Sequence, residues 1–177
     1  MTGQVVTALL AFGANLGDRG ETIAQAQAEL ARTPGISAVR ASPLRESIAL
    51  TPDGPDPDAP RYLNGVAEVD TTLSAHDLLD RLQHLESQFG RVRDVRWGDR
   101  TLDIDVVLFG GKLISDDRLT VPHPRAHERD FVLAPWLDLD PHAVLIGRGR
   151  VSELLARIGD TTRLLTPEKP EADHATS

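Results

Sequence analysis

Two aspartates separated by one residue are the clearest chemical feature of the sequence. Asp103-Ile104-Asp105 opens an apolar run at residues 106–109, which is typical of a β-strand. Alternate residues of a strand face the same side, so both carboxylates are expected to project together and Ile104 to face the opposite side. Paired carboxylates repel each other, and a hard divalent cation such as Mg²⁺ relieves that repulsion. The pair predicts a magnesium site, while two solvated aspartates on an exposed strand would give the same pattern.

Basic side chains are concentrated around this acidic pair. The arginines between residues 91 and 129 are Arg91, Arg93, Arg96, Arg100, Arg118, Arg125 and Arg129, and His123 and His127 lie in the same stretch. The planar guanidinium suits bidentate contacts to phosphate. Acidic metal ligands ringed by cationic groups are typical of a site for a triphosphate and magnesium. A single arginine is more often a solvated charge, so the prediction depends on the cluster.

Aromatic residues make up only 4% of the chain, and Tyr62, Trp97 and Phe131 lie in polar segments. Aromatic side chains in such surroundings favour a stacking pocket for a flat heterocycle. Ordinary core packing would use the same residues, and the pattern alone does not separate the two.

Several other chemistries are excluded by composition and motif. The chain has no cysteine, so disulfides, thiolate nucleophiles and Cys-ligated zinc are excluded. It also lacks a P-loop, a dinucleotide fingerprint, a Gly-x-Ser-x-Gly elbow and a His-Glu-x-x-His segment. The formal net charge of -8 argues against a nucleic-acid partner. The apolar run at residues 4–12 is too short for a membrane span or a signal peptide, which indicates a cytoplasmic protein without a membrane partner.

The elements that would position these residues follow from hydrophobic spacing and turn residues. Strands are predicted at residues 4–12, 64–73 and 102–109, with extended structure over 36–48 and a surface loop over 51–60. Helices are predicted from Asp18 or Thr22 to Pro34, from an N-cap at Ser74 to Gly90, and over 131–139 and 151–158. Gly110-Gly111 predicts a hairpin turn into residues 112–114.

This order of elements predicts an α+β fold, a sandwich related to ferredoxin-like folds, rather than a doubly wound parallel sheet. We expect a single domain over residues 1–165, because the chain length suits one core. Residues 166–177 contain prolines and scattered charges, which is typical of a flexible C-terminal tail.

Taken together, these segments resemble the 6-hydroxymethyl-7,8-dihydropterin pyrophosphokinase family. The resemblance covers, in family order, residues 12–19, 62–64, 85–86, 90–93, 96–105, 121–124 and 128–133. Its most specific part is Arg-Thr-Leu-Asp-Ile-Asp at residues 100–105. It implies a monomeric αβα sandwich with a mainly antiparallel sheet, which transfers pyrophosphate from ATP to the pterin alcohol in tetrahydrofolate biosynthesis. It also implies two Mg²⁺ ions, with AMP and the pterin diphosphate as products.

The resemblance assigns roles residue by residue. The catalytic residues it implies are Asp103, Asp105, Arg91 and Arg100, with both aspartates as metal ligands. The nucleotide contacts it implies are Gln83, Glu86, Arg91, Trp97, Arg100, Ile104, His123 and Arg129. The pterin contacts it implies are Tyr62, Asn64 and Phe131, with Thr51 and Gly54 from the 48–58 loop. The sequence departs from the family pattern at Ala14, at Asp99 and in the spacing of that loop.

Two alternatives use part of the same pattern. A metal-dependent phosphoesterase or nucleotidyltransferase would use Asp103 and Asp105 without the pterin contacts. A ferredoxin-like regulatory domain that binds a ligand would account for the fold but leave the acidic and basic cluster without a role. Within the transfer reaction itself, either aspartate is a candidate to receive the proton of the attacking hydroxyl.

Overall fold

The computed structural model describes residues 3–15, 18–51, 53–90 and 102–165. The strands are β1 (Val6–Ala14), β2 (Ile36–Ala41), β3 (Arg45–Ser47), β4 (Ala49–Thr51), β5 (Gly54–Asp56), β6 (Tyr62–Thr71), β7 (Asp103–Phe109), β8 (Ile114–Ser115), β9 (Thr120–Val121), β10 (Val144–Leu145), β11 (Gly149–Arg150) and β12 (Arg163–Leu164). The helices are α1 (Arg19–Arg32), α2 (Ala75–Gly90), α3 (Asp130–Leu139) and α4 (Val151–Ile158), with a 3-10 turn η1 (Ala126–Glu128). The predicted tail at 166–177 lies outside these residues.

The main sheet contains six strands in the order β12-β3-β6-β1-β7, and β2 also pairs with β6. Its pairings are antiparallel, as the family resemblance implied. β1 lies between β6 and β7, so that Gly13 is opposite Asn64 on one side and Asp103 on the other. This register brings segments that are far apart in the sequence into one row across the sheet.

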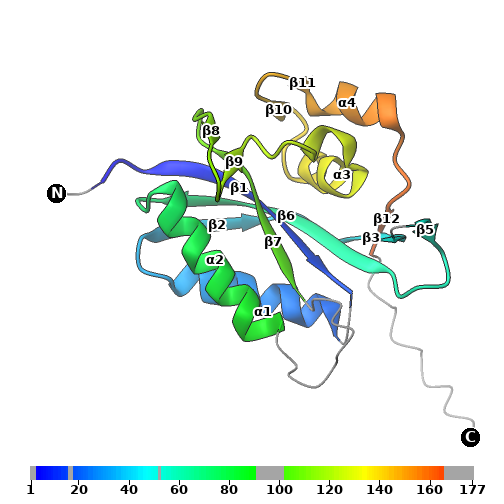
Figure 1. Cartoon of the computed structure of the whole chain (residues 1–177), viewed down its shortest axis with the longest axis horizontal. Helices are drawn as coiled ribbons and strands as arrows, with labels where there is room; N and C mark the ends of the chain where they lie inside the picture. The colour runs from blue at the N-terminus through cyan, green and yellow to red at the C-terminus, as the bar shows by residue number, and fades with distance from the viewer. Residues whose placement is uncertain (1–2, 16–17, 52, 91–101, 166–177) are drawn as a thin grey trace, which may run out of the picture.

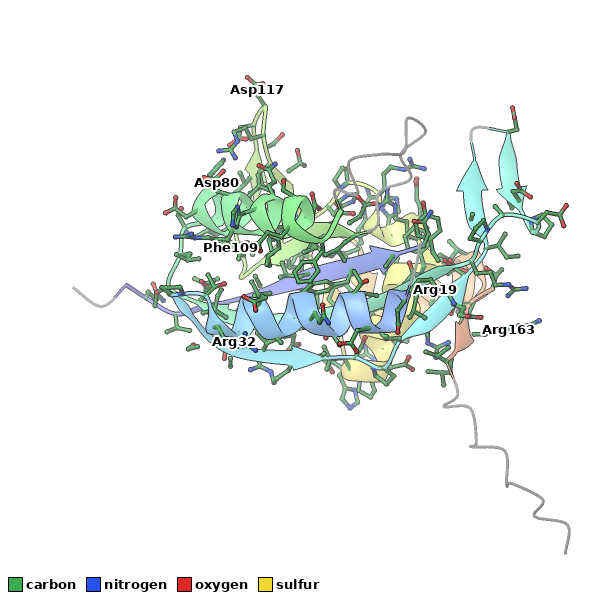
Figure 2. The ribbon with its side chains drawn as sticks, turned by 90° about the horizontal axis from the view of Figure 1, so that it is seen from below. Arg19, Arg32, Asp80, Phe109, Asp117 and Arg163 are labelled. Carbon is green, nitrogen blue, oxygen red and sulfur yellow. The ribbon has the colours of Figure 1, made fainter. Side chains whose placement is uncertain are left out.

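Helices cover both faces of this sheet, with α1 and α2 on one side and α3 and α4 on the other (Figure 1). The alternation of β1 explains the two layers, because Leu10 and Phe12 are buried against α1 and α2 while Leu9 is buried against α3 and α4. Figure 2 shows Phe109 of β7 between the sheet and the first pair of helices, where it is 1% exposed. No helix of the described part of the chain is long and apolar enough to cross a membrane.

A β-bulge divides β7 into two parts. Leu9 of β1 pairs with Leu108, whereas the next residue, Leu10, pairs with Val106. Val107 is therefore the extra residue, and Val107 and Leu108 both contact the core under α3. On the N-terminal side of the bulge the ordinary alternation places Asp103 and Asp105 on the same face as Val107.

Two predicted turns have a different structure from the one expected. The hairpin predicted at Gly110-Gly111 is wrong, because β8 pairs with β9 rather than with β7. The turn itself is present, with Gly110 at φ +53°, but the edge of β7 is taken by the segment after β9, where His123 N donates to Val107 O at 2.9 Å. The predicted loop at 51–60 contains part of a short hairpin, in which β4 pairs with β5.

The predicted helix starts agree with the structure. Asp18 is the N-cap of α1, since its carboxylate accepts from Glu21 N at 3.1 Å. Ser74 caps α2 in the same way, because its hydroxyl accepts from Asp77 N at 3.1 Å.

Arg45 of β3 connects the sheet to α3 and to the segment before β12. Its guanidinium donates twice to Asp138 of α3, at 2.6 and 2.9 Å. It also donates to Asp160 and Thr162, both at 3.2 Å, just before β12. The side chain of Arg45 is 14% exposed, and the hydrogen bond to Asp138 raises the arginine's pKa despite the opposing effect of burial. This group, the Arg45 clamp, ties the C-terminal segment to the sheet.

Asp138→Ala is expected to lower the free energy of unfolding by about 2 kcal/mol, because it removes two charge-assisted hydrogen bonds from a mostly buried arginine. Equilibrium urea denaturation would measure the change. Asp117→Ala is the matched control, since Asp117 lies exposed at the outer tip of the β8–β9 hairpin (Figure 2). Equal stability of the two variants would contradict the clamp.

Candidate active site

A cavity of about 670 Å³ opens on the α3 face of the sheet. Its walls come from β1, β3, β6, β7, the η1 turn, the start of α3, and the end of α4 with the segment after it. The side chains and backbone that line it include Gly13, Ser47, Asn64, Asp105, Arg129 and Phe131. The volume is within the range of sites for small molecules.

Gly13 forms part of the floor. A Cβ at this position would lie 3.6 Å from Asn64 Oδ1 and 4.0 Å from Tyr62 Cδ1, so both side chains reach over the glycine. Because Gly13 is opposite Asn64 and Asp103 in the sheet, the floor joins a polar amide on one side to a carboxylate on the other.

The acidic pair lies at the β7 side of the cavity, as its alternation predicted. Asp103 and Asp105 both line the cavity, and the Asp105 side chain is 47% exposed. Arg129 Nη1 is 3.4 Å from Asp105 Oδ2, and His123 Nε2 is 3.9 Å from the same oxygen. The structure therefore brings Arg129 and His123 of the predicted phosphate cluster close to Asp105, and Arg125 lines the same cavity.

Ile104 faces the other way. It is 4% exposed and packs in the core beneath α1 and α2, as the alternation of the strand requires. Its backbone N–H donates to Glu86 Oε1 at 2.7 Å. Glu86 of α2 therefore holds the outer edge of β7 between the two aspartates, which is a structural contact that its sequence context did not predict. Gln83 lies one turn earlier on α2 and is exposed.

The three predicted pterin contacts line one cavity, although they come from different elements. Tyr62 and Asn64 project from β6, and Phe131 lies in the first turn of α3. The Arg129 guanidinium carbon is 5.6 Å from the centre of the Phe131 ring. Aromatic and charged groups thus share the wall between the acidic pair and the amide.

Of the remaining predicted site residues, Gly54 does not line the cavity and the side chains of the others lie outside the described part of the structure. Gly54, at φ +109°, lies in the β4–β5 hairpin opposite Thr51 and is not among the described residues that line the cavity. The side chain of Thr51 lies outside the described part of the structure, as do Arg91, Trp97 and Arg100.

The sequence analysis missed two parts of the cavity wall. Ser47 is 6% exposed and lines the cavity from β3. Ile158, Gly159 and Thr161 line it from the C-terminal side. Asp130 fixes this segment, since its Oδ2 accepts from Thr161 N at 2.8 Å and from Thr161 Oγ1 at 2.6 Å. A contact between residues so far apart leaves no local pattern that could have revealed it.

The metal-binding capacity of the cavity depends on the aspartate pair. Among the described residues there is no group of three or more histidine, aspartate or glutamate side chains arranged to hold a metal ion. A pair of carboxylates is still the usual protein contribution to a magnesium site, where substrate phosphates and water complete the coordination.

His123 is expected to be neutral at neutral pH. Burial lowers its pKa below the ordinary value of 6.5; Arg129 and Arg125 lower it further, and Asp105 opposes them. The unfolded chain binds this proton more tightly than the folded protein does. The contribution of neutral His123 to the free energy of unfolding is therefore complete above pH 6.5 and is lost as the pH falls below it.

An NMR titration of the free protein should give a His123 midpoint below 6.5, and Asp105→Asn should lower that midpoint further. Arg129→Gln should raise it, whereas Arg148→Gln, on an exposed turn, should leave it unchanged. A midpoint at or above 6.5 would contradict this description of the site.

A model of the 7,8-dihydro-6-hydroxymethylpterin-pyrophosphokinase (HPPK) family matches residues 9–141. The chain is 46% identical over 147 residues to the 2-amino-4-hydroxy-6-hydroxymethyldihydropteridine pyrophosphokinase of Pseudomonas aeruginosa, covering 83% of this chain and 88% of that protein. It is 37% identical over 156 residues to the protein of the same name from Haemophilus influenzae, covering 88% and 95%.

Solved structures agree at the level of the fold. The crystal structure of wild-type Plasmodium falciparum HPPK-DHPS with SDX-DHP matches with a TM-score of 0.69 at 11% sequence identity. The match covers 91% of this chain and 48% of that one, so the chain spans about half of the solved protein. The family match at residues 9–141 includes β1, β6, β7 and α3, the elements that carry the aspartates, the amide and the two aromatic rings.

Proposed function

The chain belongs to the 7,8-dihydro-6-hydroxymethylpterin-pyrophosphokinase family, and from this we infer that it transfers pyrophosphate from ATP to 6-hydroxymethyl-7,8-dihydropterin. The products are AMP and the pterin diphosphate, and the reaction belongs to tetrahydrofolate biosynthesis. One observation supports this function best: a single cavity is lined by an amide and two aromatic rings together with two carboxylates and two arginines, and His123 Nε2 lies 3.9 Å from one of those carboxylates. Such a cavity suits a flat heterocycle beside a polyphosphate.

The pterin ring is proposed to bind between Tyr62 and Phe131, with its polar edge at Asn64. The polyphosphate is proposed to bind at His123 and Arg129, together with Arg91 and Arg100. The nucleotide would extend towards Gln83, Glu86, Ile104 and Trp97. The hydrogen bond from Ile104 N to Glu86 Oε1 supports their place beside the site, because it holds the strand that carries both aspartates.

Asp103 and Asp105 are proposed to hold two Mg²⁺ ions, and the donor set fits this role. Both side chains supply hard oxygen ligands from one strand face to the same cavity. When bound, the metal neutralises negative charge on the phosphate oxygens.

The protein's own groups then account for the remaining steps. The pterin hydroxymethyl oxygen forms a bond to the β-phosphorus of ATP, the bond from that phosphorus to the oxygen shared with the α-phosphate breaks, and AMP leaves. Arg129 holds the phosphates in line and balances charge as it develops. The hydroxyl proton passes to a carboxylate oxygen of Asp103 or Asp105 and then to solvent.

We also propose the finer features of the fold and its setting. The order strand-helix-strand, strand-helix-strand along β1, α1, β2, β6, α2 and β7 supports a ferredoxin-like αβα sandwich. Residues 1–165 are proposed to form one catalytic domain with residues 166–177 as a tail. The protein is proposed to act as a cytoplasmic monomer, a setting that suits a chain without cysteine.

Incubation of the protein with ATP, Mg²⁺ and the pterin alcohol tests the function directly. AMP should form in proportion to the pterin consumed, and omission of the pterin should stop AMP formation. A phosphoesterase would instead hydrolyse a phosphate ester without pterin, and a regulatory domain would give no turnover. Isothermal titration with a nonhydrolysable ATP analogue, with and without Mg²⁺, separates the last case, because a regulatory module does not require the metal for binding.

A further inference from the structure

Within the part of the chain that the structure describes, the side-chain amide of Asn64 is held from one side. Asn64 is 4% exposed, and its Nδ2 donates to Ser47 Oγ at 2.8 Å and to the backbone oxygen of Arg45 at 3.3 Å. Both partners belong to β3, the strand next to β6 in the sheet. The two hydrogens of the amide group are therefore both directed at β3.

The Arg45 carbonyl decides which way the amide faces. A hydroxyl donates or accepts, so Ser47 alone would tolerate either orientation, but a backbone carbonyl only accepts. The amide atom that faces both partners must therefore be the nitrogen. The position of the Arg45 carbonyl is itself fixed, because Arg45 pairs with Asn64 in the sheet and its side chain forms the Arg45 clamp.

The oxygen of the amide consequently faces the cavity. Asn64 Oδ1 lies 3.6 Å from the position that a Cβ would take on Gly13, which places it over the floor. With both N–H groups used by β3, the amide offers the cavity an acceptor and no donor. A ligand edge that carries an N–H matches this amide, whereas an edge with only acceptors would leave two acceptors facing each other.

We propose that Ser47 is a positioning residue that sets substrate specificity by locking Asn64 with its oxygen towards the cavity, so that the pterin must present a ring N–H to it. This inference depends on the proposed function. Loss of the Ser47 hydroxyl would leave the amide with the longer contact to Arg45 alone, and an amide that rotates presents its NH₂ group to the substrate for part of the time.

Steady-state kinetics of Ser47→Ala should show a pterin KM about tenfold higher, the equivalent of about 1.4 kcal/mol, with kcat within about twofold and the KM for ATP unchanged. Ser47→Thr should restore the pterin KM, because threonine keeps the hydroxyl. Ser152→Ala, on the exposed face of α4, is the matched control and should behave as wild type. In an Asn64→Ala background, Ser47→Ala should add nothing to the pterin KM.

Substrate analogues test the polarity of the amide. The 3-methyl and 8-methyl pterin alcohols each lack one ring N–H. For at least one of them, the kcat/KM of wild type should be about tenfold or more below that for the unmethylated alcohol. Ser47→Ala should reduce this difference in kcat/KM. Equal rejection by both proteins would overturn the assignment of specificity to Ser47.

Hydrogen exchange tests the lock without relying on a variant that folds. In the free wild-type protein, the Asn64 side-chain NH₂ protons should exchange with solvent at least tenfold more slowly than those of Gln88, which is exposed on α2. Exchange of the Asn64 protons at the rate of Gln88 would overturn the inference, as would a full effect of Ser47→Ala on the pterin KM in the Asn64→Ala background.

The failure of the inference can be told apart from the failure of the proposed function. If wild type makes no pterin-dependent AMP, the proposed function fails and the inference fails with it. If wild-type turnover is normal and one of the two contradicting results above is found, the inference alone is rejected.

Discussion

Asp105→Asn is expected to lower kcat by about three orders of magnitude, with the free energy of unfolding within about 0.5 kcal/mol of wild type. The substitution keeps the shape of the side chain and removes its charge. Asp105 is about half exposed, so its contribution to packing is small. Its Oδ2, however, lies 3.4 Å from Arg129 and 3.9 Å from His123, in the charged wall formed by Asp103, Asp105 and Arg129. Loss of one carboxylate from a two-carboxylate site should weaken Mg²⁺ binding and leave the phosphate charge uncompensated.

The measurement is kcat at saturating ATP, Mg²⁺ and pterin, with urea denaturation as the check on folding. Asp117→Asn is the matched control, because it makes the same chemical change on the exposed β8–β9 hairpin, and it should retain full activity. Turnover of Asp105→Asn within tenfold of wild type would count decisively against the metal assignment.

Arg129→Lys is expected to lower kcat by about two orders of magnitude even though the charge is kept. The guanidinium lies between Asp105, at 3.4 Å, and the Phe131 ring, at 5.6 Å. A planar fork can contact a phosphate while it lies against the ring, whereas an ammonium group supplies a point charge and loses the planar contact. The pterin KM should also rise, because the position of Phe131 depends in part on this contact.

Kinetic constants for both substrates would separate these two effects. Arg148→Lys, on the exposed turn between β10 and β11, is the control and should have no effect on either constant. If Arg129→Lys retains full turnover, Arg129 has no part in phosphate transfer, and the charged wall must act through other residues.

Elements whose apolar and polar residues alternate with a regular period could be predicted from the sequence. Helix α2 was expected from the spacing of its leucines and from Ser74, and Leu78 and Leu82 are fully buried as that spacing requires. The shared face of Asp103 and Asp105 followed from the period of two in β7. In each case the pattern exists because one face of the element is buried against a single layer.

Features that depend on distant partners could not be predicted. β12 pairs with β3, and the only local sign is a pair of exposed residues, Arg163 and Leu164, near the end of the described chain. The hairpin expected after Gly110 failed for the same reason: the turn is local, but the choice of partner for β8 depends on β9. Ser47 was missed because β3 has three residues, too few for an alternating pattern.

The site shows a similar division. The residues alone indicated an acidic pair and a basic cluster, and the structure brings Asp103, Asp105, Arg125 and Arg129 to one cavity, with His123 3.9 Å from Asp105. Tyr62 and Phe131 were first grouped by their polar sequence surroundings, which core packing would explain equally well, and Asn64 joined them only through the family resemblance. Their shared cavity is a fact of the structure, and their roles towards the pterin stay predictions.

The row formed by Asn64, Gly13 and Asp103 acts as a molecular ruler. Adjacent strands are about 4.8 Å apart, so the amide and the carboxylate stand two strand spacings, about 10 Å, from each other. Backbone hydrogen bonds set this length, and substitutions that repack either core therefore leave it unchanged. A synthetic ligand that joins a ring recognised at Asn64 to a phosphate mimic at Asp103 would need a linker of that fixed length, and shorter or longer linkers should lose affinity in step with the mismatch.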